Sequence, residues 1–153
     1  SERLAEFSAR CVLYDTGIQR IAKDLLAQIV GRYLARETDA VQVLHSIKTL
    51  ATEMAYAISE GEWEYLGQLV DRHWRLNHVL DEHTTNAPIN ALLAEVKPFI
   101  SGAKLAGAGG GGFLIMICPT PEYADKLRQY LAARPGPGKI YEWALGDEGI
   151  RVE

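Results

Sequence analysis

The chain has 153 residues, of which 48% are hydrophobic and 24% charged, and its formal net charge is −4. This length suits one domain with its own core. The acidic balance argues against a nucleic-acid surface, which would be basic, and no apolar stretch approaches the roughly 20 residues that cross a bilayer. Because the chain starts at Ser1 rather than at a methionine, we expect a fragment or a processed piece of a longer protein.

The first half of the chain predicts one strand followed by several helices. Residues 10–14 (RCVLY) are typical of a short strand. Thr16 and Gln19 then have the spacing of a helix capping box. Apolar residues at three- and four-residue steps predict helices over residues 18–33, 44–58 and 66–80, the second of which ends at Gly61. A polar turn over residues 81–86 precedes a short helix over residues 88–96.

The second half is expected to be richer in strands. Residues 103–106 and 112–118 predict two strands, and the second is so apolar that we expect it to be central and buried on both faces. Thr120 and Pro121 are typical of a helix start, and residues 139–145 predict a last strand. The order indicates an α+β fold, a ferredoxin-like βαββαβ sheet whose first crossover is expanded into three or four helices.

A glycine-rich segment joins the two middle strands, within residues 103–118 (AKLAGAGGGGFLIMIC). Glycine loses the most conformational freedom on folding, so such a cluster indicates positive φ angles or a close approach of the backbone to another group. Inward-turned N–H groups would make an anion site, usually for phosphate, and the alternative is a flexible hairpin turn. We predict a loop over residues 107–111 between adjacent strands, with at least one glycine at positive φ. Neither common phosphate motif is present, because Phe113 and Leu114 replace the P-loop Lys and Ser/Thr and a strand, not a helix, follows.

Residues 104–112 (KLAGAGGGG) resemble the third motif of the GHMP small-molecule kinases, the group of galactokinase, homoserine kinase, mevalonate kinase and phosphomevalonate kinase. Within that group, residues 73–77 (HWRLN), 80–81 (LD), 84–86 (TTN) and 100–104 (ISGAK) resemble the L-fucose kinases, and the heptose-phosphate kinases are also similar. The resemblance runs from about Tyr14 to the C-terminus. It implies the C-terminal domain of an ATP-dependent kinase that phosphorylates a sugar hydroxyl, for fucokinase the anomeric one, giving fucose 1-phosphate.

The resemblance also implies cofactors, a partner and a set of site residues. ATP and Mg²⁺ would be held mainly by the N-terminal half of the same kinase, which is expected to be absent from this chain. The nucleotide side would be contacted by Lys104, Gly107, Ala108, Gly109, Gly110, Gly111 and Gly112. No catalytic residue is assigned, because the chain has no second glycine-serine loop and no acidic residue inside a phosphate motif.

Four polar residues are candidates for contact with the sugar: Tyr14, Arg20, His73 and Asn77. His73 stands on an apolar helical stripe with Asn77 one turn later, so the pair either faces a sugar or is structural. Arg20 could contact a phosphate or a sugar, or be a solvated surface group. No metal site is predicted, because the five-residue spacing of the histidines turns successive side chains by about 140° on a helix.

The two cysteines bear on the cellular setting, and the fold class leaves a second function open. Cys11 and Cys118 lie in apolar strand-like segments, so we expect buried free thiols and a reducing, cytoplasmic setting. Ferredoxin-like sheets host many functions, so the rival hypothesis is a non-catalytic binding or interaction domain.

Overall fold

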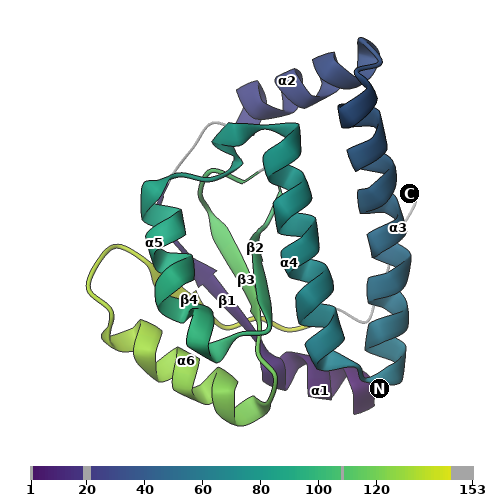
Figure 1. The fold of residues 1–153 in the computed structure, drawn as a ribbon. Helices are drawn as coiled ribbons and strands as arrows, with labels where there is room; N and C mark the ends of the chain where they lie inside the picture. The colour runs from purple at the N-terminus through teal and green to yellow at the C-terminus, as the bar shows by residue number, and fades with distance from the viewer. Residues whose placement is uncertain (1, 19–21, 108, 146–153) are drawn as a thin grey trace, which may run out of the picture.

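The computed structural model describes residues 2–18, 22–107 and 109–145 and contains a four-stranded antiparallel sheet (Figure 1). The strands are β1 (Cys11–Asp15), β2 (Gly102–Leu105), β3 (Phe113–Ile117) and β4 (Lys139–Tyr141). Their order is β2-β3-β1-β4, and every neighbouring pair is antiparallel. The predicted α+β fold with a ferredoxin-like sheet is confirmed.

Strand β3 is central, between β2 and β1, and both of its faces pack against other elements. Leu114 and Met116 are fully buried in the core that α5 and α6 cover. Ile115 and Ile117 point to the other face, where they pack with α3 and α4. Only Phe113, at the start of the strand, is substantially exposed. The prediction of a central strand buried on both faces therefore holds for all but its first residue.

The connection from β1 to β2 contains four α-helices, as the expanded crossover predicts. They are α2 (Ala22–Leu34), α3 (Thr38–Glu60), α4 (Trp63–Leu80) and α5 (Ala87–Val96), with single 3₁₀ turns at Glu82–Thr84 and Lys97–Phe99. Helix α3 ends at Gly61, whose φ of 75° gives the left-handed C-cap that glycine favours. Helices α3 and α4 run side by side along one edge of the molecule (Figure 1).

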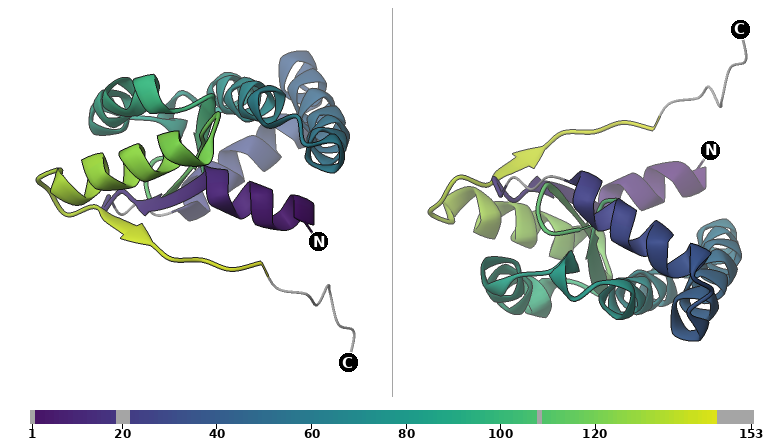
Figure 2. Two further views of the ribbon diagram at one scale, coloured as in Figure 1. Left: turned by 90° about the horizontal axis from the view of Figure 1, so that it is seen from below. Right: turned by 90° about the horizontal axis from the view of Figure 1, so that it is seen from above.

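Helix α6 (Pro121–Ala133) follows β3 and begins as the sequence predicts. The Thr120 hydroxyl accepts a hydrogen bond from the Tyr123 N–H, and Pro121 occupies the first helical position. Figure 2 shows α5 and α6 over one side of the sheet and helix α1 (Glu2–Arg10) toward the other. Cys11 and Cys118 are buried free thiols, as expected, and burial raises the pKa of each to about 12.

Predictions for both ends of the chain need correction. Arg10 ends helix α1, which the sequence did not reveal because none of its residues is buried. The last strand ends at Tyr141 rather than at residue 145, and it pairs with β1 only from Leu13 to Asp15. Beyond the strand, Trp143 packs edge-on against Phe7 of α1, with ring centroids 5.6 Å apart.

No helix in the described ranges is long and apolar enough to cross a lipid bilayer.

Candidate functional site

The glycine loop, residues 106–112, joins β2 to β3 at one end of the sheet. Four of its described glycines have positive φ: Gly107 (67°), Gly109 (91°), Gly110 (79°) and Gly112 (78°). A strand follows the loop, and no helix opens there. The prediction of a loop between adjacent strands with glycines at positive φ is confirmed, and Ala108 lies outside the described residues.

The second half of the loop is hydrogen-bonded to this chain on both flanks. On one flank the Gly110 N–H donates to the Thr84 carbonyl at 2.5 Å, and the Asn86 side-chain amide donates to the Gly110 carbonyl at 3.0 Å. On the other flank the Gly112 N–H donates to the Ile18 carbonyl at 2.9 Å. These N–H groups of Gly110 and Gly112 are therefore engaged within the domain. We call Gly109–Gly112 the anchored segment.

Close packing explains why two residues of the anchored segment lack side chains. A Cβ atom on Gly109 would lie 2.5 Å from the Thr84 carbonyl oxygen, and one on Gly111 would lie 2.3 Å from the Ile18 carbonyl oxygen. A Cβ atom on Gly107 would meet nothing within 4 Å. Ala106 and Gly107 are exposed, and we call these two residues the tip of the loop. The loop thus has one part packed against the domain and one part open to an outside group.

Thr16 helps to hold the anchored segment. Its N–H and its hydroxyl both donate to the Gly112 carbonyl at 2.9 Å, and its hydroxyl oxygen accepts the Ile18 N–H at 3.2 Å. The predicted capping partner, Gln19, lies outside the described residues.

A polar cluster of Lys104, His73 and Asn77 lies beside the loop. Burial, followed by the charge of Lys104, lowers the pKa of His73 to about 4, and burial lowers the pKa of Lys104 as well. At neutral pH the imidazole of His73 is therefore neutral. Asn77 is only 8% exposed, and its side-chain amide makes no hydrogen bond to another described residue. Lys104 is thus near enough to His73 to affect its pKa, and the Asn77 carbonyl accepts the hydroxyl of Thr84 at 3.1 Å, next to the glycine loop.

Two other predicted contacts are not part of this cluster. Tyr14 and Leu105 both align with Leu114 across the sheet, so they share one face, and Lys104 points to the opposite face. Tyr14 is 1% exposed and belongs to the core under α5 and α6. Arg20 lies outside the described residues.

Sequence reasoning did not assign a role to Thr84 and Asn86. Their segment was noticed only as part of the resemblance to fucose kinases. The spacing of Asn86 and Ile89 in the sequence indicates only a helix N-cap. The contact of Asn86 with Gly110 spans 24 residues, so no local pattern predicts it.

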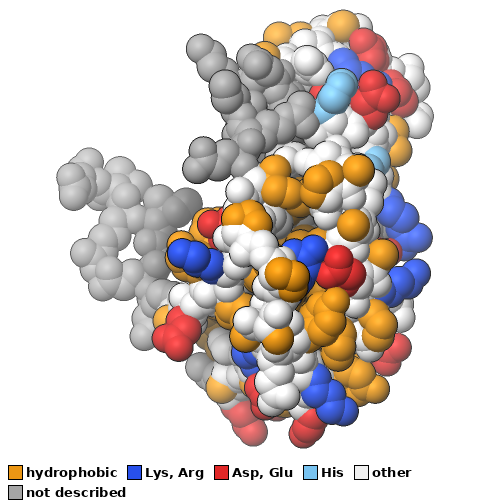
Figure 3. Space-filling model, turned by 90° about the vertical axis from the view of Figure 1, so that its left-hand side faces the viewer, with side chains coloured by type: hydrophobic (Ala, Val, Ile, Leu, Met, Phe, Trp, Pro, Cys, Tyr) orange, Lys and Arg blue, Asp and Glu red, His pale blue; other side chains and the backbone are white. Residues whose placement is uncertain are grey.

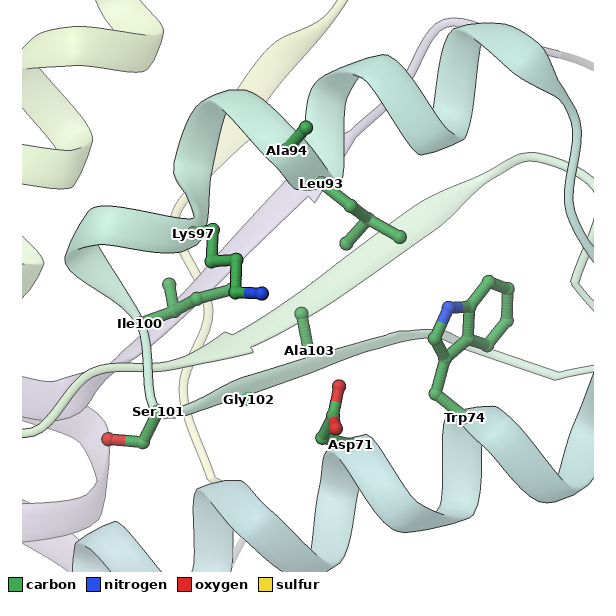
Figure 4. A pocket seen from close by; sticks show the side chains of 9 residues that line it. All are labelled: Asp71, Trp74, Leu93, Ala94, Lys97, Ile100, Ser101, Gly102 and Ala103. Atoms are coloured by element: carbon green, nitrogen blue, oxygen red, sulfur yellow. The ribbon is translucent and has the colours of Figure 1, made fainter.

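A separate hollow of about 400 Å³ lies between α4 and α5, over the start of β2. In Figure 4, Lys97 extends into it from the end of α5 and Asp71 from α4, with Ala103 between them and Trp74 at one end. None of the predicted site residues lines it. Figure 3, which views the molecule from the side of α5 and α6, shows hydrophobic side chains interspersed with both signs of charge.

The residues beside the loop suit an anion rather than a metal ion. Backbone N–H groups, an ammonium group and an amide can all donate hydrogen bonds to phosphate or hydroxyl oxygens. No group of three His, Cys, Asp or Glu side chains within the described ranges is placed to hold a metal.

The sequence was compared with protein families and curated proteins. Residues 54–137 match the family model described as GHMP kinases C terminal. Over 143 residues the chain is 36% identical to the L-fucokinase/L-fucose-1-P guanylyltransferase of Bacteroides fragilis and 32% identical to the bifunctional fucokinase/GDP-fucose pyrophosphorylase of Arabidopsis thaliana. These matches cover 92% and 93% of this chain but only 15% and 14% of the relatives.

A third relative is similar over a larger share of its own length. The D-glycero-alpha-D-manno-heptose 7-phosphate kinase of Campylobacter jejuni is 29% identical over 150 residues, which cover 96% of this chain and 42% of that protein. The chain therefore spans less than half of each of these relatives.

Solved structures share the fold. The L. major mevalonate kinase in complex with R-mevalonate aligns with a TM-score of 0.73 at 19% identity, over 86% of this chain and 40% of that one. The Lactococcus lactis galactokinase complexed with galactose aligns with a TM-score of 0.60 at 16% identity, over 86% of this chain and 44% of that one.

Proposed function

This chain belongs to the GHMP kinases C-terminal family, and on that premise we propose that it is the C-terminal domain of an ATP-dependent sugar kinase that acts on L-fucose. The domain spans the described sheet and helices, and its partner is the N-terminal half of the same kinase. The observation that carries the proposal is a glycine loop with an open tip that directly follows β2, on which Lys104 lies, in a chain similar to two fucokinases over 92–93% of its length.

Each part of the site has a chemical role in this proposal. Phosphoryl transfer depends on in-line positioning and on neutralising charge on the phosphoryl oxygens. The tip, at Gly107, offers open backbone at positive φ, where N–H dipoles can face a phosphate of the nucleotide. Lys104 adds a positive charge three residues before it. We assign no catalytic base to this domain, because no acidic residue lies within the glycine motif.

We assign the contacts with the sugar to His73 and Asn77. A neutral imidazole has one donor and one acceptor nitrogen, and an amide has both donors and acceptors, which suits vicinal hydroxyl groups. Asn77 is only 8% exposed, so a hydrogen bond from its amide to the sugar would form in a site largely shielded from water.

The residues proposed to contact the ligands include no carboxylate, and Mg²⁺ in such sites is usually held by one or two carboxylates together with the phosphates. We therefore propose that any Mg²⁺ in the reaction is held by the N-terminal half together with ATP.

The test is a sugar phosphorylation assay on the complete protein that contains this chain. With ATP, Mg²⁺ and L-fucose, we expect ADP release and a sugar phosphate whose ³¹P signal couples to the anomeric proton. The control is D-glycero-D-manno-heptose 7-phosphate. Faster turnover of the heptose phosphate would support the proposed kinase activity but would contradict L-fucose as its substrate. Background ADP release with both, from a folded protein, would contradict the kinase and favour a non-catalytic domain.

A further inference from the structure

We infer that the turn over residues 81–86 is a positioning device for the glycine loop, and that Asn86 holds the loop while it also caps helix α5. This inference rests on the proposed function only for its effect on turnover. The anchoring itself follows from contacts within the domain.

The Asn86 side chain serves two elements at once. Its Oδ1 atom accepts the Ile89 N–H at 3.0 Å, which caps the first turn of α5. Its Nδ2 atom donates to the Gly110 carbonyl at 3.0 Å. One planar amide therefore sets the distance between the start of α5 and the anchored segment. An aspartate could supply the cap but not the second hydrogen bond.

Thr84 holds the same glycine from its other side. Its carbonyl accepts the Gly110 N–H, so that both polar backbone groups of Gly110 are bonded to this turn. The Thr84 hydroxyl is buried and lies 2.7 Å from the Asp81 carbonyl and 3.1 Å from the Asn77 carbonyl. The turn is thus tied to the last residues of α4, where the polar cluster lies.

These contacts join the end of α4, the glycine loop and the start of α5 into one unit. Asn77 lies on the first element and the loop tip on the second, so the turn sets the distance between the sugar side and the phosphate side. Asn86 touches neither proposed ligand. It is a positioning residue, and its removal should disturb the loop before it disturbs the fold.

The experiment compares Asn86→Asp with Asn90→Asp in the complete protein. Asn90 lies one turn further along α5, is exposed, and accepts only the Thr85 hydroxyl at 2.7 Å, so it receives the same chemical change away from the loop. The readouts are hydrogen exchange of peptides covering residues 106–113 and 87–96, the urea midpoint, and kcat and KM with L-fucose and ATP. Loss of one hydrogen bond predicts roughly tenfold faster exchange in the loop peptide and roughly tenfold lower kcat in Asn86→Asp.

In Asn86→Asp, we expect the α5 peptide to keep its protection and the KM for the sugar to stay within about twofold, because the cap and the polar cluster are intact. Asn90→Asp should match the wild type. Unchanged loop exchange, or normal kcat despite faster exchange, would overturn the inference. If the wild type shows no kinase turnover but the loop exchange responds as expected, the anchoring stands and the proposed function fails. Asn86→Ser keeps a capping oxygen without the amide N–H and replaces the aspartate variant should that misfold.

Discussion

The glycines of one loop have two different reasons to be glycine. In the anchored segment, Gly109 and Gly111 lack side chains because carbonyl oxygens of this same chain occupy the space. At the tip, Gly107 shares a positive φ with Gly109 but has open space in the place of a side chain. Gly109 and Gly111 are thus explained by the fold of this domain, whereas Gly112 is held there by its hydrogen bonds and a Cβ on it would meet nothing within 4 Å. The tip is explained only by a left-handed turn, or by something that approaches from outside.

Because the anchored segment and the tip differ in this way, substitutions only a few residues apart should affect either the stability or the activity of the protein. Substitutions in the anchored segment should unfold or displace the loop, whether or not the nucleotide half is present. Substitutions at the tip should cost little stability and matter only when a ligand or partner arrives.

The largest effect is expected for Gly109→Ala. The new Cβ would lie 2.5 Å from the Thr84 carbonyl oxygen at a φ of 91° that side chains rarely adopt. Overpacking and the left-handed backbone together should lower the free energy of unfolding by about 3 kcal/mol. Urea unfolding of the complete protein measures it. A loss under about 1 kcal/mol would show that the anchored segment is not packed as described.

Thr84→Val should come next, because it removes a buried hydroxyl without changing the volume of the side chain. We expect a loss of about 1.5 kcal/mol in the free energy of unfolding, since the hydroxyl lies within hydrogen-bond distance of two backbone carbonyls at the end of α4. Thr84→Ser keeps the hydroxyl and is the control. Equal stability of the valine and serine variants would show that the Thr84 hydroxyl does not help to hold the loop.

Gly107→Ala should affect the catalytic activity more than the free energy of unfolding. Its Cβ meets nothing within 4 Å, so only the positive φ is penalised, by about 1 kcal/mol. We expect the kcat/KM for ATP to fall further than this stability loss suggests, because the methyl group would occupy the open side of the tip. Measuring KM for both substrates tests this. Kinetics that stay normal would make the tip a plain turn.

Asn77→Ala probes the sugar side of the cluster. If the buried amide binds substrate, its loss should reduce kcat/KM for the sugar by about 2- to 12-fold, which corresponds to about 0.5–1.5 kcal/mol, with the KM for ATP nearly unchanged. A shifted urea midpoint together with normal sugar kinetics would instead assign Asn77 to the fold.

The smallest effect concerns the charge beside His73. Burial and then Lys104 lower the pKa of His73 to about 4, below its ordinary value of 6.5. The unfolded chain therefore binds this proton first as the pH falls, so the His73 contribution to stability is present above about pH 6.5 and is lost toward pH 4. Lys104→Met should raise the pKa of His73 partway to its ordinary value, as an NMR titration of the imidazole would show. An unmoved pKa would place Lys104 too far from His73 to belong to the cluster.

The sequence predicted most of the elements, and its failures have local causes. Helices α3 to α6 follow apolar stripes, α3 ends at Gly61, and α5 and α6 begin at the side-chain caps Asn86 and Thr120. Strand β3 is a continuous apolar run, so short-range patterns were sufficient. Helix α1 was missed because it buries no residue, and β4 was overextended because alternation continues past the last strand partner at Tyr141. For the site, the pattern located the glycine loop but could not tell which glycines pack against this domain, and the roles of His73 and Asn77 stay predictions.

By itself, the amino-acid sequence determined the order of the elements, the ferredoxin-like sheet and the position of the glycine loop, because these depend on periodicity and on residues near one another in the chain. Only the tertiary structure decided that Thr84, Asn86 and Ile18 hold the loop, and that Tyr14 belongs to the core rather than to the site. The physical reason is distance along the chain. A hydrogen bond between Asn86 and Gly110, or the choice of sheet face for Tyr14, exists only once strands and turns far apart in sequence have been brought together.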